Sequence, residues 1–184
     1  MKSLHNLADQ RASIPLLADD VLEFHAARLL LLLKVCGVAG RIDGLTKMAK
    51  LDFFVRYPQF FDEVCRHLGN LDKSVTTPRS VESSMIRFHY GPWDSRYYHV
   101  LSYLEAKDLI SVERDGRMFR FKLTESGKTI ANKAEGSAAY SHLVEHMRNV
   151  KKVLGAKQGS TLKNLVYEVF GKEVADRPLG KVIT

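Results

Sequence analysis

The spacing of apolar positions is most regular between residues 92 and 131, where it changes from a helical period to alternation and back. A helix is predicted to start at Pro92, which suits a first helical turn, because apolar residues then recur three and four positions apart. Two strands follow, and Asp115 and Gly116 between them are typical of a tight type I′ turn with positive φ angles. A second helix is predicted after Thr124, which can cap its first turn. The apolar positions are Tyr97, Val100, Leu101 and Leu104 in the first helix, Leu109, Ile110, Met118, Phe119, Phe121 and Leu123 in the strands, and Ile130 and Ala131 in the second helix.

This order of helix, hairpin and helix is that of the recognition helix and wing of a winged helix-turn-helix. Earlier segments supply the other helices of such a fold. Residues 21–37 are apolar on most sides, so this helix is expected to be central. A second helix is predicted over residues 45–54, and Pro58 starts a third that Gly69 ends. The predicted fold class is mainly α with a small β-hairpin: a winged helix-turn-helix core with an N-terminal arm and additional C-terminal helices.

The chain divides into three predicted parts. Residues 1–19 are polar and mixed and form an arm, whereas residues 20–135 form the winged-helix core, with the wing at about 109–123. Residues 136–184 form a C-terminal helical extension. Within the core, residues 70–84 have the composition of a linker or exposed loop.

The extension is predicted to contain two helices, one from Ala138 to Leu154 and a second after the break at Gly155 to Gly159. Apolar positions of the second helix fall on one face, which either packs on the protein's own core or binds a partner. This candidate partner helix is defined by Leu162, Leu165, Val166, Val169 and Phe170.

Composition and charge qualify a DNA-binding interpretation. The chain has 184 residues, 45% of them hydrophobic and 27% charged, as in ordinary globular proteins. Its net charge of +7 and isoelectric point near 9.4 favour an acidic partner, of which nucleic acid is the usual one. However, residues 71–135 carry eleven Lys and Arg against nine Asp and Glu, and residues 136–184 carry eight against four. Much of the surplus therefore lies in the extension, where a solvated helical face also explains it.

Basic residues around the predicted wing are the candidate DNA or partner surface. In a DNA-binding winged helix the recognition helix enters the major groove, while wing arginines contact phosphate or the minor groove. Glu113 and Asp115 dilute the charge of this wing, and Tyr90, Trp93 and Tyr97 can instead form a buried aromatic cluster. The candidate surface residues are Arg87, His89, Arg96, Arg114, Arg117, Arg120 and Lys122.

Only one motif suggests catalysis. His142, Glu145 and His146 form an H-x-x-E-H sequence, which on a helix places two histidines on one face and is the inverted zinc-protease signature. The alternative is a helix surface that carries two histidines. The sequence has no phosphate-binding loop or nucleophile elbow, and Cys36 and Cys65 lie in apolar surroundings that disfavour thiolates. We therefore expect that the protein is not an enzyme and that it has no catalytic residues, no cofactor and no metal.

The run from Leu29 to Leu33 is the most membrane-like segment. Arg28 and Lys34 bracket it, and a membrane span needs about 20 apolar residues. The N-terminus lacks the basic, apolar and small-residue regions of a signal peptide. We therefore expect a cytoplasmic protein that does not bind a membrane.

Two segments of the core have distinctive sequences, namely Gly44 to Phe61 (GLTKMAKLDFFVRYPQFF) and Met85 to Ile110 (MIRFHYGPWDSRYYHVLSYLEAKDLI). They resemble the small middle component of ABC-three-component anti-phage and anti-plasmid defence systems, the class that includes Lamassu. The similarity covers roughly Val21 to Ala131 and does not extend to the arm or the final helices. This resemblance implies a non-enzymatic subunit that joins an SMC-like ATPase to an effector, often a nuclease. The complex senses foreign DNA and restrains the effector until the ATPase engages DNA.

Two functions from different classes follow. The first is a non-catalytic adaptor in a hetero-oligomer with an SMC-like ATPase and an effector nuclease, in which any DNA contact is made through the complex. The alternative is a winged-helix DNA-binding transcriptional regulator, which is expected to be a homodimer on palindromic sites. A zinc hydrolase built on His142 and His146 is a third hypothesis and requires stoichiometric metal.

Overall fold

A computed structural model describes residues 21–70, 86–88 and 91–175 of the chain. The predicted N-terminal arm and nearly all of the predicted linker lie outside these residues. The described chain is mainly helical, with a small three-stranded antiparallel sheet, so the mainly α class is confirmed. None of the helices in the described ranges has the length and apolar character needed to cross a bilayer.

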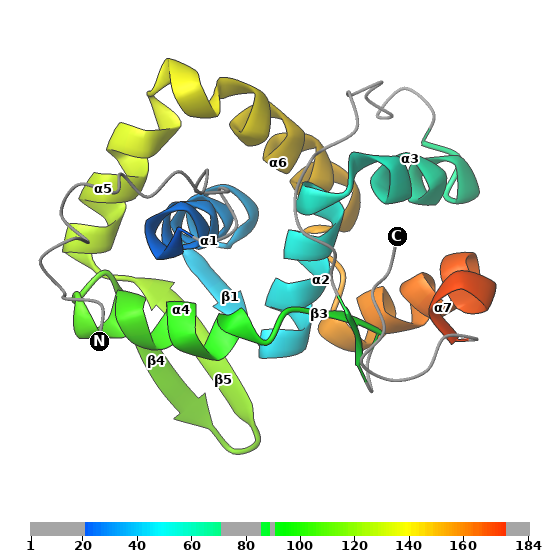
Figure 1. The fold of residues 1–184 in the computed structure, drawn as a ribbon, viewed down its shortest axis with the longest axis horizontal. Coiled ribbons are helices and arrows are strands. Elements are labelled where there is room, and N and C mark those ends of the chain that lie inside the picture. The colour runs from blue at the N-terminus through cyan, green and yellow to red at the C-terminus, as the bar shows by residue number, and fades with distance from the viewer. Residues whose placement is uncertain (1–20, 71–85, 89–90, 176–184) are drawn as a thin grey trace, which may run out of the picture.

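Helix α1 (Leu22–Cys36) occupies the centre of the fold, as the sequence predicts (Figure 1). It has apolar residues on every side, and Leu29 to Leu33 are at most 2% exposed. Burial of this run explains why a segment of membrane-like composition belongs to the core of a folded domain. The helices that pack around α1 are α2 (Leu45–Arg56), α4 (Arg96–Ala106), α5 (Glu125–Glu135) and α6 (Ser141–Leu154).

The sheet has the strand order β1-β5-β4, with β1 at Arg41–Asp43, β4 at Ile110–Asp115 and β5 at Met118–Leu123. The β4–β5 hairpin matches the predicted strands. Its turn is different: Asp115 pairs with Met118, and only Gly116 of the turn has a positive φ angle (60°). This pattern fits a type II′ turn one residue later than predicted, because glycine at the first central position satisfies the turn alone.

Three short strands were absent from the sequence prediction. Strand β1 lies between α1 and α2 and pairs with β5. Strands β2 (Ile86–Phe88) and β3 (Gly91–Trp93) pair with each other just before α4. Each has three residues, too few for an alternating pattern to be recognised. Pro92 therefore lies in β3, and the expectation that it starts a helix is wrong, since α4 begins at Arg96.

Helix α5 begins as predicted, with Thr124 as its N-cap. The Thr124 hydroxyl accepts a hydrogen bond from the backbone N–H of Gly127 at 3.0 Å and donates one to the Asp108 carbonyl at 2.6 Å. This residue therefore closes the helix start and ties it to the base of the hairpin.

Replacing Thr124 with alanine is expected to lower the free energy of unfolding by about 1 kcal/mol, because the helix start loses its side-chain acceptor. Denaturant unfolding measures the change. Thr129→Ala is the matched control, since that hydroxyl lies exposed in the same helix and only donates to the Glu125 carbonyl. An equal loss in both variants would show that the cap contributes nothing specific.

The C-terminal helices pack into the same core. The predicted 138–154 helix is present as a 3₁₀ turn at Ala138–Tyr140 followed by α6. Helix α7 (Gly159–Ala175) lies beside α2 and α3 (Pro58–His67), and the Phe170 ring contacts the Phe60 ring edge-on at 4.9 Å. Of the predicted partner stripe, four side chains are at most 6% exposed and Val169 is partly buried. The stripe thus covers the protein's own core, and its proposed use as a partner helix is contradicted. It consists of Leu162, Leu165, Val166, Val169 and Phe170.

Candidate functional site

A buried polar cluster joins α1, α2 and α4. Arg28 of α1 donates from Nε to Asp52 Oδ1 of α2 at 2.9 Å, and the Tyr97 hydroxyl of α4 donates to Asp52 Oδ2 at 2.8 Å. These three residues are at most 2% exposed. A carboxylate this deeply buried is tolerated only when it is paired with a cation and hydrogen-bonded. Arg28 supplies the paired cation for Asp52, and Tyr97 supplies a further hydrogen bond.

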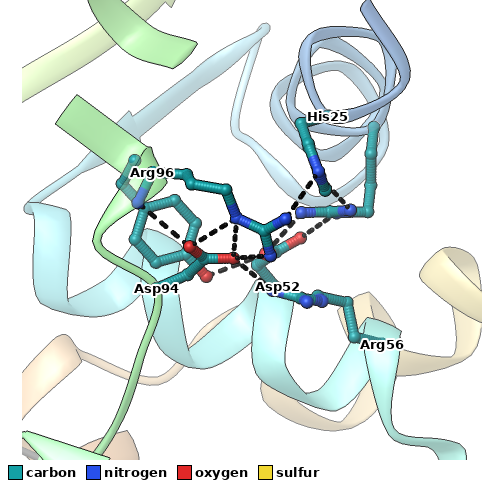
Figure 2. Close-up of polar contacts among 7 residues, drawn as sticks. His25, Asp52, Arg56, Asp94 and Arg96 are labelled. Carbon is teal, nitrogen blue, oxygen red and sulfur yellow. Dashed lines mark hydrogen bonds and ion pairs between the residues drawn. The ribbon is translucent and has the colours of Figure 1, made fainter. Parts of the chain in front are cut away.

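A second carboxylate extends the cluster toward the start of α4 (Figure 2). Asp94 accepts from Arg56 at 2.8 Å and from Arg96 at 2.7 Å, and it also accepts the backbone N–H of Arg96 at 3.0 Å. Burial disfavours the charged form of Asp94, but the hydrogen bonds from Arg96 and the charges of Arg56 and Arg96 outweigh it. They hold the pKa of the Asp94 carboxyl well below its usual value.

His25 links the two halves of the cluster. Its Nδ1 lies 3.0 Å from an Arg28 nitrogen, and its Nε2 lies 3.0 Å from an Arg96 nitrogen. Figure 2 shows His25 above Asp52, facing Arg96. A neutral imidazole has one acceptor nitrogen, so only one of these guanidinium groups donates to the ring at a time. The cluster fixes the start of α4 against α1 and α2.

The structure separates the basic residues that the sequence groups into one surface. Arg96 belongs to the buried cluster. Arg120 pairs with Asp115, and Arg114 donates to the carbonyl of Gly116 at 3.0 Å. Arg117 and Lys122 are exposed on the hairpin. Arg87 lies in β2, but the structure does not describe its side chain, and His89 lies outside the described residues. Of the predicted aromatic cluster, only the Tyr97 side chain is described, and it is buried.

A groove of about 210 Å³ runs between α4 and the β4–β5 hairpin, and we call it the α4 groove. Phe119 and Phe121 project from the same side of β5, with ring centroids 6.5 Å apart. Phe121 is buried under α4, whereas Phe119 continues the same row beyond it and is 41% exposed. The residues that line this groove include Tyr98, Leu101, Glu105, Val112, Phe119 and Phe121.

A larger groove of about 730 Å³ lies on the other side of Leu45 and Phe119, which line both grooves. We call it the β1 groove, because β1 forms one wall while the hairpin tip and the first turn of α7 form the others. Its lining mixes apolar and charged side chains, including Val38, Arg41, Asp43, Lys47, Arg117 and Met118.

Exposed apolar side chains gather at these two grooves. Among the described residues, the exposed large hydrophobic side chains are Val38, Tyr98, Met118, Phe119 and Ile130. All except Ile130 line one groove or the other. Single exposed apolar residues are common on protein surfaces, whereas several that line neighbouring grooves are candidates for a contact site.

The zinc-protease arrangement is not formed by the described side chains. His142 is exposed, whereas His146 is 6% exposed, with Nε2 2.9 Å from the Phe54 carbonyl oxygen. Burial lowers the pKa of His146 despite this hydrogen bond. The alternative of two surface histidines is therefore wrong for His146, which is a core residue. Among the described residues, no group of three or more His, Cys, Asp and Glu side chains could hold a metal ion.

Both cysteines are buried free thiols, as expected. The Cys36 thiol donates to the Met147 carbonyl at 3.4 Å, and burial raises its pKa to about 12. A thiol with this pKa carries almost no thiolate at neutral pH, and thiolate is the reactive form.

Sequence reasoning missed two parts of the site. It did not single out Tyr98, although position 98 lies off the apolar face formed by Tyr97 and Leu101, so an aromatic ring there must meet solvent or a partner. It also treated Arg28 only as a boundary of an apolar run. A charged residue in a helix that is apolar all round has to be paired within the protein.

A scan against protein-family models and searches of the curated proteins and of the solved structures found no match.

Proposed function

We propose that this chain is a non-catalytic adaptor with a winged helix-turn-helix core, in which α4 corresponds to the recognition helix and the β4–β5 hairpin to the wing. The α4 groove is the observation that carries the proposal. Its exposed aromatic side chains, Tyr98 and Phe119, are suited to bury against another protein, because aromatic residues dominate the centres of protein interfaces.

The charges around this groove favour a protein over DNA. A duplex reader needs free cations on the recognition helix and wing to contact phosphates. Here Arg96 is bonded to Asp94, Arg120 is paired with Asp115, and Glu105 lines the groove. Arg117 and Lys122 remain as exposed cations of the hairpin. Sequence-independent attraction to a phosphate backbone would be weakened by these acidic partners.

The resemblance to defence-system middle components supplies the kind of partner. We propose that the adaptor joins an SMC-like ATPase to an effector nuclease in an antiviral complex, where it restrains the effector until the ATPase engages DNA. Its rigid α4, held by the buried cluster, would present the groove to one of these partners without reorganisation on binding.

Replacing Phe119 or Tyr98 with aspartate is expected to weaken the complex with the ATPase or effector at least about tenfold, because a buried interface aromatic is exchanged for a charge. Ile130→Asp is the matched control, since Ile130 is 43% exposed on α5, against 41% for Phe119, and lines neither groove. Affinity is measured by titration, and circular dichroism verifies the fold of each variant. Equal binding by the Phe119 and Ile130 variants would rule out the α4 groove as the contact site.

A further inference from the structure

We infer that the β1 groove binds an acidic segment of a partner protein, one in which carboxylates accompany apolar side chains. This inference deepens the proposed adaptor function and rests on it, since it states the chemistry of the partner. Two properties of the groove carry it, namely its exposed apolar wall and its surplus of positive charge.

The apolar wall comes from two separate parts of the chain. Val38, in the turn after α1, is 71% exposed, and Met118, at the start of β5, is 38% exposed. Phe119 extends this wall toward the α4 groove. Covering these side chains removes apolar surface from water, which favours an occupant with apolar side chains of its own.

Among the described residues that line the groove, three are cations and one is a carboxylate. Asp43 accepts from Arg41 at 3.2 Å, so one cation is neutralised within the groove. Lys47 donates to the Gly155 carbonyl at 2.8 Å, which uses one of the three donors of its ammonium group, and no carboxylate of the described residues pairs with it. Arg117, at the hairpin turn, forms no hydrogen bond or ion pair with any residue of the described chain. The groove therefore has an excess of two positive charges that carboxylates of an occupant would complement.

A nucleic acid, with its phosphates, matches the β1 groove less well than a peptide that carries carboxylates. A nucleic-acid backbone would place hydrated phosphates against Val38 and Met118 and gain nothing from covering them. A protein segment places apolar side chains on this wall and carboxylates at Lys47 and Arg117 in the same contact. Leu45 and Phe119 line both grooves, so one extended segment can continue from the β1 groove into the α4 groove.

The test titrates the full-length chain with two short synthetic peptides that share alternating leucines and differ only in having aspartate or lysine between them. Methyl NMR follows Val38, Leu45 and Met118. The aspartate peptide is expected to shift these methyl signals at lower concentration than the lysine peptide. Arg117→Glu is expected to weaken aspartate-peptide binding about tenfold, with the loss reduced at high salt. Arg66→Glu is the control, because Arg66 is exposed on α3 and lines neither groove.

Three results would overturn the inference: no shift of these signals, equal binding of both peptides, or an aspartate-peptide affinity that Arg117→Glu leaves unchanged. Displacement of the aspartate peptide from the same methyl groups by duplex DNA would assign the groove to nucleic acid and would also overturn it. None of these readouts requires the ATPase complex. Failure of this inference is therefore distinguishable from failure of the adaptor proposal.

Discussion

Replacing Asp52 with asparagine is expected to lower the free energy of unfolding by about 3 to 5 kcal/mol, because it leaves a buried arginine without its counter-ion. Arg28 is 2% exposed and Asp52 is fully buried, so water cannot compensate for the lost charge. The asparagine side chain has nearly the same shape, which avoids a cavity. Its NH2 group cannot accept the hydrogen bonds from Arg28 or Tyr97, so the loss of an acceptor adds to the loss of charge. Chemical denaturation of the purified chain measures the change.

Asp115→Asn is the matched control for this result. Asp115 also pairs with an arginine, Arg120, but it is 56% exposed on the hairpin. Exposed pairs contribute about 0 to 1 kcal/mol, because solvent screens the charges and both side chains lose conformational freedom. If Asp52→Asn destabilised the chain no more than Asp115→Asn, the buried cluster would not be what holds α4 against α1 and α2.

Replacing Lys50 with methionine is expected to stabilise the protein at neutral and mildly acidic pH. Lys50 is 1% exposed on α2, and burial, reinforced by the charge of Lys163, lowers its pKa from 10.5 to about 7. That gap corresponds to roughly 5 kcal/mol of cost when the amine is protonated in the folded state. Methionine has a similar unbranched shape without a charge, so we expect a gain of about 2 to 4 kcal/mol at pH 6.5.

The pH dependence of stability provides a sharper readout. Between pH 7 and 10.5 the unfolded chain keeps its Lys50 proton while the folded chain has lost it. The unfolded state binds more protons in this window, so the wild-type free energy of unfolding rises with pH there. Lys50→Met is expected to remove that rise, whereas Lys152→Met, at an exposed position on α6, is expected to keep it. An unchanged slope in Lys50→Met would mean that Lys50 is charged and solvated in the folded protein.

The helices were the most predictable part of the fold. The apolar periods around Leu101 and Leu165 and the cap at Thr124 are local signals, and the structure has helices at each of them. Strand β1 was not predictable in this way, because its three residues are defined by pairing with Lys122, Phe121 and Arg120 far along the chain. The start of α4 was misplaced for a related reason, since the helix begins at Arg96, whose backbone N–H donates to the side chain of Asp94, and Pro92 lies in a strand.

The candidate site was less predictable than the fold. A sequence shows that Arg96 and Arg117 are basic, but not that one is bonded to a buried carboxylate while the other lines an open groove. The pairing of Arg28 with Asp52 joins residues 24 positions apart on different helices. Such contacts are determined by tertiary packing, which a local pattern does not contain. The apolar grooves also depend on three or more elements meeting, and only the structure brings these elements together.

Co-expression with the proteins encoded beside this chain's gene, followed by mass measurement of the purified assembly, examines the adaptor proposal itself. The expected result is a stable hetero-oligomer that contains this chain and an SMC-like ATPase, and that Phe119→Asp disrupts while Ile130→Asp does not. A chain that purifies alone as a homodimer and shifts its own promoter DNA would contradict the proposal and identify a transcriptional regulator instead.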